Sequence, residues 1–112
     1  MILRNSLVDD IVSGHVSEEE HRAVLKTITR DLSKIFQDIM PKKFWIFPQN
    51  PHVYCLSNSL CIEMPGFGGE NYLSVLNELE SQLRSRFVVE THYFDGKITF
   101  VVKKNKNRNL YI

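Results

Sequence analysis

The stretch from Ser17 to Met40 constrains the fold of this chain more than any other segment. Its apolar residues recur at steps of three and four, which places them on one face of a helix. They are Val24, Leu25, Ile28, Leu32, Ile35, Phe36 and Ile39. Ser17 and Glu20 have the spacing of a capping box, and Pro41 cannot continue a helix. We therefore expect a long amphipathic helix over residues 17–40, whose apolar face the remaining chain must cover.

The rest of the chain alternates between turn-forming residues and short β-forming runs. Strands are expected at residues 44–47, 53–56, 60–64, 88–94 and 97–102. The last two runs flank Asp95-Gly96, a preferred two-residue hairpin turn because both of its residues need positive φ. A second amphipathic helix is expected over 70–86, and a weaker helical pattern covers 2–12.

This order of elements predicts an α+β domain, with a single antiparallel sheet of about five strands and two main helices on one face. The expected order is α-βββ-α-ββ, preceded by a short N-terminal helix. A single domain is expected over residues 1–112, with 103–112 as a basic C-terminal tail. The order resembles the layout of secretion-chaperone-like domains, and its first five elements resemble that of double-stranded-RNA-binding domains. Element order alone assigns no function.

The composition is that of an ordinary globular protein. Hydrophobic residues make up 43% of the 112 residues and charged residues 24%, which argues against disorder. The formal net charge of +1 gives no global attraction to nucleic acid or membranes, so such binding needs a local patch. Asp9 and Asp10 interrupt the N-terminal apolar run, unlike a signal peptide, and no run approaches the roughly 18 apolar residues of a membrane span. We expect a cytoplasmic protein.

The two cysteines lie in a run that is nearly symmetric about Asn58. If residues 57–59 form the hairpin loop, Cys55 faces Cys61 across the strand pair. A two-residue turn at Asn58-Ser59 sets Leu56 against Cys61 instead. In a reducing compartment both cysteines are expected to remain thiols.

No residue pattern indicates catalysis, a cofactor or a metal. The histidines are scattered, at His15, His21, His52 and His92. Their spacing from the cysteines matches no zinc motif, and nothing supports a nucleophilic pair such as Cys61 with His92. The glycines at 66, 68 and 69 precede a helix, but Glu70 and Asn71 follow where a phosphate loop needs Lys and Ser or Thr. We therefore expect a protein that is not an enzyme.

The best functional signal is an excess of apolar residues on both faces of the expected sheet. A sheet covered by helices on one side should be polar on the other, because that side meets water. The surplus residues are Trp45, Phe47, Tyr54, Tyr93 and Val101. They predict a non-catalytic protein-binding module, such as an adaptor, a chaperone-like protein or an assembly subunit. Its partner would be another protein chain, either a second copy or part of a larger assembly, and not a membrane.

The alternative function is nucleic-acid binding through basic residues on the first long helix and in the C-terminal tail. Arg22, Lys26, Arg30 and Lys34 follow one another at four-residue steps along the helix. Lys103, Lys104, Lys106 and Arg108 make the tail basic. A row of cations can track phosphates, although a solvated helix face has the same pattern.

Overall fold

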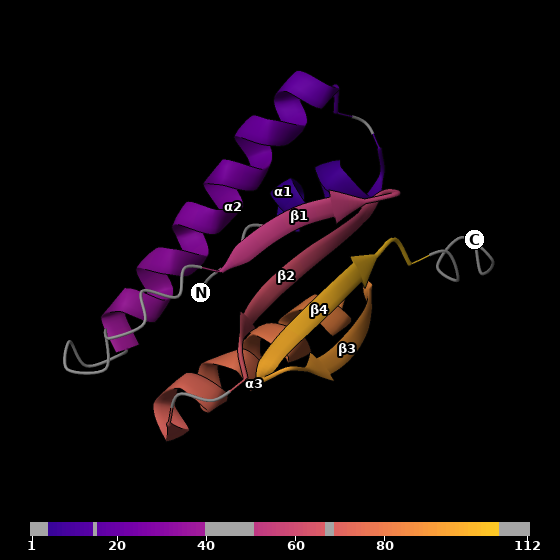
Figure 1. Cartoon of the computed structure of the whole chain (residues 1–112). Coiled ribbons are helices and arrows are strands. Elements are labelled where there is room, and N and C mark those ends of the chain that lie inside the picture. Colours follow the sequence, from indigo (N-terminus) through magenta and orange to yellow (C-terminus); the bar gives the residue numbers. More distant parts are fainter. Residues whose placement is uncertain (1–4, 15, 40–50, 67–68, 106–112) are drawn as a thin grey trace.

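The computed structural model describes residues 5–14, 16–39, 51–66 and 69–105 (Figure 1). Three helices and four strands follow one another in the order α-α-ββ-α-ββ. Their bounds are α1 Asn5–Val12, α2 Glu18–Ile39, β1 His52–Leu56, β2 Ser59–Pro65, α3 Glu70–Arg84, β3 Val88–Phe94 and β4 Lys97–Lys103. The helices therefore lie where the apolar periodicity predicted them, within a few residues at each end.

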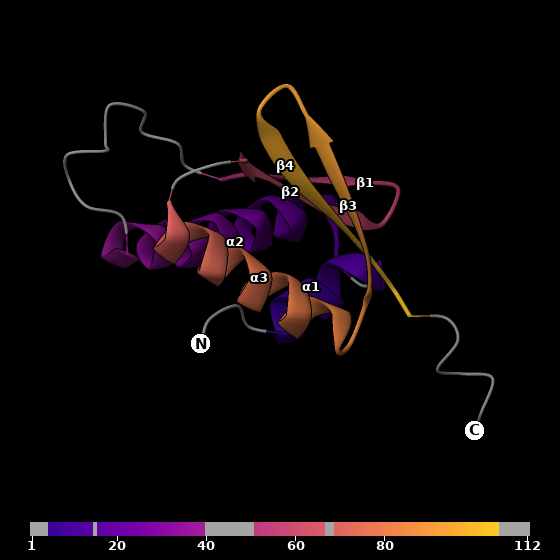
Figure 2. The same cartoon turned by 90° about the horizontal axis from the view of Figure 1, so that it is seen from below.

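The strands form one antiparallel sheet in the order β1-β2-β4-β3. Two hairpins, β1–β2 and β3–β4, meet where β2 pairs with β4. All three helices lie on the same face of this sheet, as Figure 2 shows. The described part of the chain is thus a small α+β domain of two layers, and no described helix covers the second face of the sheet.

The core lies between the helices and the inner face of the sheet. The helices contribute Val8, Ile11, Val12, Ile28, Leu32, Phe36, Tyr72, Leu76, Leu79 and Leu83. The strands contribute Val53, Leu60, Ile62, Met64, Val89, Ile98, Phe100 and Val102, with Phe87 just before β3. On β2 and β4 the inner residues alternate with outward-facing ones, because successive strand side chains point to opposite faces. This alternation defines the outer face.

The two longer helices, α2 and α3, each start next to a residue that favours a helix N-terminus. The Ser17 hydroxyl accepts a hydrogen bond from the Glu20 backbone N–H at 3.3 Å, which satisfies one free donor of the first turn of α2. Gly69 precedes α3 at φ 93°, a conformation that glycine adopts without steric cost. Inside α3, the Tyr72 hydroxyl donates to the Pro65 carbonyl at 2.8 Å, which ties the helix to the end of β2.

The first expected strand, residues 44–47, lies outside the described residues. The described sheet accordingly has four strands instead of about five. Lys103, expected as the start of the tail, is the last residue of β4. The hairpin at Asp95-Gly96 is confirmed, with φ of 52° and 74° at its two central residues.

Both predicted registers of the first hairpin are wrong. Its turn is made by Ser57 and Asn58, at φ 47° and 64°, so that Leu56 pairs with Ser59 and Tyr54 with Cys61. This register is shifted by one residue from the symmetric loop. A shift of one residue moves a side chain to the other face of the sheet. Cys55 consequently packs against the core while Cys61 belongs to the outer face, and both are free thiols.

Candidate protein-binding face

The outer face of the sheet has an apolar centre. Tyr54 on β1 pairs with Cys61 on β2, and Cys61 pairs with Val101 on β4, so these residues form one row across three strands. Tyr54 and Val101 are half-buried. The Tyr54 ring packs against the His52 ring with centroids 4.8 Å apart, which extends the row along β1.

Cys61 lies at the middle of this row and is only 3% exposed, although it points away from the helices. Tyr54 and Cys61 are directly paired across β1 and β2, so each side chain affects the ionisation of the other. Burial raises the pKa of the Cys61 thiol, and burial followed by the nearby Cys61 raises the pKa of the Tyr54 hydroxyl. Both groups therefore stay neutral near pH 7, and the centre of the outer face carries no charge.

Ion pairs on β2, β4 and β3 border this neutral centre. Lys97 on β4 lies 3.3 Å from the Glu63 carboxylate on β2. Glu90 on β3 accepts from Lys103 at 3.1 Å and lies 3.5 Å from His92. The hydrogen bond from Lys103 lowers the pKa of Glu90, so this carboxylate is ionised at neutral pH. An apolar centre with a charged rim is the usual anatomy of a protein interface.

Two aromatic residues are strongly exposed at the end of the β3–β4 hairpin. Phe94 is 82% exposed and belongs to the outer face. Tyr93 is 74% exposed and pairs with the core residue Ile98, so it belongs to the helix-facing side of the sheet. In Figure 2 this end of the hairpin projects beyond the helices, which explains why an inward-facing position is not covered.

The structure brings together only part of the predicted protein interface. Tyr54 and Val101 share the outer face and flank Cys61. Tyr93 lies on the other side of the sheet. Trp45 and Phe47 fall outside the described residues. Sequence reasoning missed Cys61, because its place between Tyr54 and Val101 depends on the pairing of β2 with β4, strands that are not consecutive in the chain.

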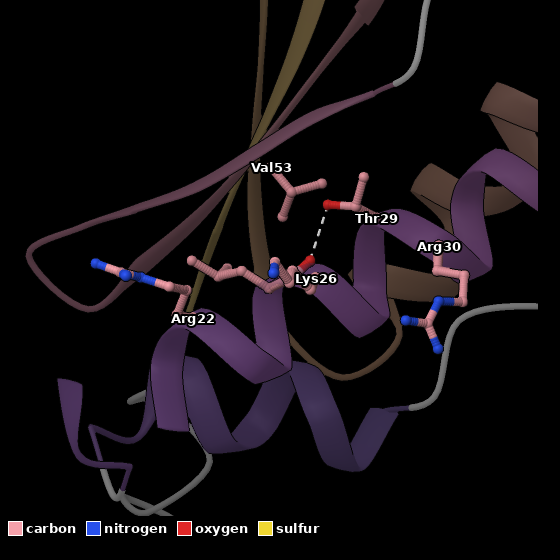
Figure 3. Close-up of a pocket in the computed structure, with 6 residues that line it drawn as sticks. Arg22, Lys26, Thr29, Arg30 and Val53 are labelled. Carbon is pink, nitrogen blue, oxygen red and sulfur yellow. Dashed lines mark hydrogen bonds between the residues drawn. The ribbon is translucent and has the colours of Figure 1, made fainter. Parts of the chain in front are cut away.

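The basic residues of α2 border a shallow groove of about 540 Å³ between this helix and β1, lined by Arg22, Leu25, Lys26, Thr29, Arg30 and Val53. Figure 3 shows that the charged ends of Arg22 and Arg30 point away from each other. Their charges are therefore spread along the helix and do not converge on one point. Lys34 is also exposed.

The described basic residues of the tail do not share a surface with the basic residues of α2. Lys103 lies on the outer face of β4 and binds Glu90. The helix lies on the opposite side of the sheet. Lys104 is exposed just after β4, and Lys106 and Arg108 lie outside the described residues. The described chain therefore does not combine the two basic segments into one surface.

Within the described residues, no group of three or more His, Cys, Asp or Glu side chains is arranged to hold a metal ion. Cys61 and His92 are separated by β4, which lies between their strands. In the part of the chain that the structure describes, no helix has both the length and the apolar character needed to cross a bilayer.

No family model, curated protein or solved structure matches this chain. Function must therefore be argued from the geometry of the described surfaces alone.

Proposed function

We propose that this protein is a non-catalytic protein-binding module, such as an adaptor, a chaperone-like protein or an assembly subunit. It holds another protein chain on the outer face of its sheet. The binding residues are Tyr54 and Val101, with Cys61 as the floor between them, and the ion pairs of the rim set the orientation of the partner.

One observation carries this proposal. The helices all lie on one face, yet the opposite face has an uncharged row of Tyr54, Cys61 and Val101 at its centre. Apolar surface in this row is unfavourably exposed to water. Its burial under a partner contributes roughly 25 cal/mol of binding free energy per Å². Tyrosine also combines a large apolar ring with a hydroxyl, which suits it to interfaces.

Nucleic-acid binding is the second candidate, supported by the groove beside Arg22, Lys26 and Arg30. Phosphate binding depends on several cations that meet one backbone, and affinity then falls steeply with salt. The divergent side chains in Figure 3 and the net charge of +1 favour the protein partner over nucleic acid.

Photo-crosslinking from two positions tests the proposal. A photoreactive phenylalanine analogue replaces Tyr54 on the outer face in one variant and Lys26 on α2 in another. We expect the Tyr54 position to give discrete protein adducts in native lysate that survive nuclease treatment. The Lys26 position is the matched control, because it presents the same probe on the opposite side of the sheet.

Nuclease-sensitive adducts from Lys26, with none from Tyr54, would replace the proposal by nucleic-acid binding. Adducts of equal pattern from both positions would mean that neither surface is specific. Each adduct is identified by mass spectrometry, which separates a second copy of this chain from a different protein.

A further inference from the structure

The β3 strand forms an edge of the sheet, and no described strand pairs with its outer side. It is seven residues long, Val88–Phe94, and contains no proline. The other edge strand, β1, has five residues, follows Pro51 and packs beside α2. An edge of this length is a template for another strand, because its outward backbone groups pair with no strand among the described residues.

The turn at Asp95-Gly96 determines which backbone groups face outward. Its positive φ angles are those of a type I′ turn, in which the Phe94 carbonyl accepts from the Lys97 N–H. Antiparallel partners alternate between hydrogen-bonded and non-hydrogen-bonded pairs. Counting back along β3, the backbone N–H and C=O groups of Val89, Thr91 and Tyr93 therefore point away from β4.

We propose that a second copy of this chain pairs with this edge, β3 against β3 in antiparallel orientation, with Thr91 on the two-fold axis. The two sheets then join into one continuous sheet. In this register Thr91 exchanges backbone hydrogen bonds with Thr91 of the second copy, and Val89 exchanges them with Tyr93.

The side chains of β3 are complementary to themselves in this register. On the outer face, Glu90 lies opposite His92 of the second copy, and Val88 lies opposite Phe94. Because of the two-fold symmetry, each of these pairs occurs twice in the dimer. Val88 is 41% exposed, Tyr93 74% and Phe94 82%. These are apolar residues without cover in one copy, and each gains an apolar neighbour across the axis, the type of cross-strand pair that stabilises sheets.

Other registers are less favourable. If one β3 strand slides by one residue, the outward-facing backbone groups of one copy meet residues of the other copy whose groups already bond to β4. The hydrogen bonds between the two copies then cannot form. A slide by two residues in one direction places Glu90 opposite Glu90 of the second copy, which is repulsive. A slide by two in the other direction sets Glu90 against Phe94 and leaves Val88 unpaired. Only the register centred on Thr91 uses all of β3.

The middle of β3 is already held in place from the helix side. The Thr91 hydroxyl donates to the Glu80 carboxylate of α3 at 2.6 Å, and Arg84 donates to the same hydroxyl at 3.4 Å. Glu80 and Arg84 also lie 3.7 Å apart. These contacts fix the central residue of the edge on α3, so less conformational freedom is lost when a second strand pairs with it.

The dimer contact does not involve Tyr54, Cys61 or Val101, although Glu90 and His92 belong both to this edge and to the charged rim of the outer face. The edge strand β3 and the strand that carries Tyr54 lie at opposite sides of the sheet. Pairing at β3 leaves Tyr54 and Val101 uncovered, so either claim can fail alone.

Light scattering with concentration-dependent sedimentation tests the assembly on the full chain. We expect a dimer that dissociates on dilution. His92→Glu places like charges opposite each other twice per dimer and should weaken the dimer about tenfold, the effect of roughly 1.4 kcal/mol. His92→Gln is the matched control and should change the dissociation constant far less. A monomer at every concentration contradicts the proposal, as does a dimer equally stable in both variants.

Disulfide trapping tests the register, in a background that carries Cys55→Ala and Cys61→Ala. Glu90→Cys and His92→Cys are made as separate proteins of different tag length, and circular dichroism verifies that each is folded. When they are mixed and mildly oxidised, we expect mixed dimers to form faster than links between identical copies, because residues 90 and 92 face each other across the axis. Faster linking of identical copies, or no linking, contradicts this register.

Discussion

Gly96 occupies the second central position of the β3–β4 turn, at φ 74°. Its carbonyl also accepts a hydrogen bond from the Gly66 N–H at 2.8 Å, which joins the turn to the end of β2. A β-branched residue is strained at this φ, because its Cβ clashes with the backbone. The turn therefore fixes both the hairpin register and the contact with Gly66.

We expect Gly96→Val to lower the free energy of unfolding by about 1–3 kcal/mol, the usual cost of a strained backbone conformation. Chemical denaturation measures the change. Lys97→Val is the control, since it places the same side chain one residue later, in extended strand. A stability equal to that of the unsubstituted chain would mean that the turn does not constrain the hairpin.

Tyr72 gives a second prediction at the residue scale. Burial raises the pKa of its hydroxyl well above its usual range, and this hydroxyl bonds the Pro65 carbonyl. Above about pH 10 the unfolded chain loses this proton while the folded chain keeps it. The free energy of unfolding must therefore fall as the pH rises through that value.

We expect Tyr72→Phe to lower the free energy of unfolding by about 1–2 kcal/mol at neutral pH, because the hydrogen bond disappears. Above about pH 10, the free energy of unfolding of this variant should decline less steeply with pH. Thermal or urea unfolding across alkaline pH measures both effects. Tyr93→Phe removes an exposed hydroxyl and serves as the control for the loss at neutral pH. An alkaline slope unchanged by Tyr72→Phe would show that this hydroxyl ionises equally in both states.

At the element scale, α2 packs through a stripe whose centre is Leu32, 1% exposed. Leu76 on α3, 3% exposed, belongs to the same core, as the periodicity of both helices predicted. We expect Leu32→Ala to cost about 2–5 kcal/mol, from lost burial and the cavity left behind. Lys34→Ala on the exposed side is the matched control. A loss below about half a kcal/mol for Leu32→Ala would mean that α2 is not a core element.

The elements differ in how far the sequence predicts them. Helix α2 has both an apolar period and a cap at Ser17, and the second hairpin has Asp95-Gly96, a turn with one dominant geometry. The first hairpin has Ser57, Asn58 and Ser59, which all form turns, so the pattern does not choose the pair with positive φ. The pairing at this turn then decides the face of each cysteine.

The candidate site was predictable only in part for a related reason. Tyr54 and Val101 are visible as apolar residues on expected strands. Their common row with Cys61 requires β2 to lie beside β4, a pairing between strands separated by α3. The ion pairs of Glu63 and Glu90 likewise join different strands. Local patterns do not contain this long-range order.

At the scale of the whole molecule, the two layers place the candidate surfaces for a protein partner and for nucleic acid on opposite sides of the sheet. Helix α2 presents its cations on one side of the sheet, and the uncharged row lies on the other. Substitutions on one surface can therefore be tested for loss of binding while the other surface stays unchanged. Apolar contacts also respond weakly to salt, whereas phosphate contacts weaken steeply.

The central claim is that the outer face holds a protein partner, and a quantitative pull-down from native lysate tests it most directly. The unsubstituted chain is compared with Tyr54→Thr/Val101→Thr and with Arg22→Gln/Lys26→Gln/Arg30→Gln, each with and without nuclease and at low and high salt. All three proteins must share a melting temperature within a few degrees. We expect one protein partner to be retained by the unsubstituted chain and the helix variant under every condition, and lost by the outer-face variant. Retention by the outer-face variant, or loss on nuclease treatment or with the helix variant, would contradict the account.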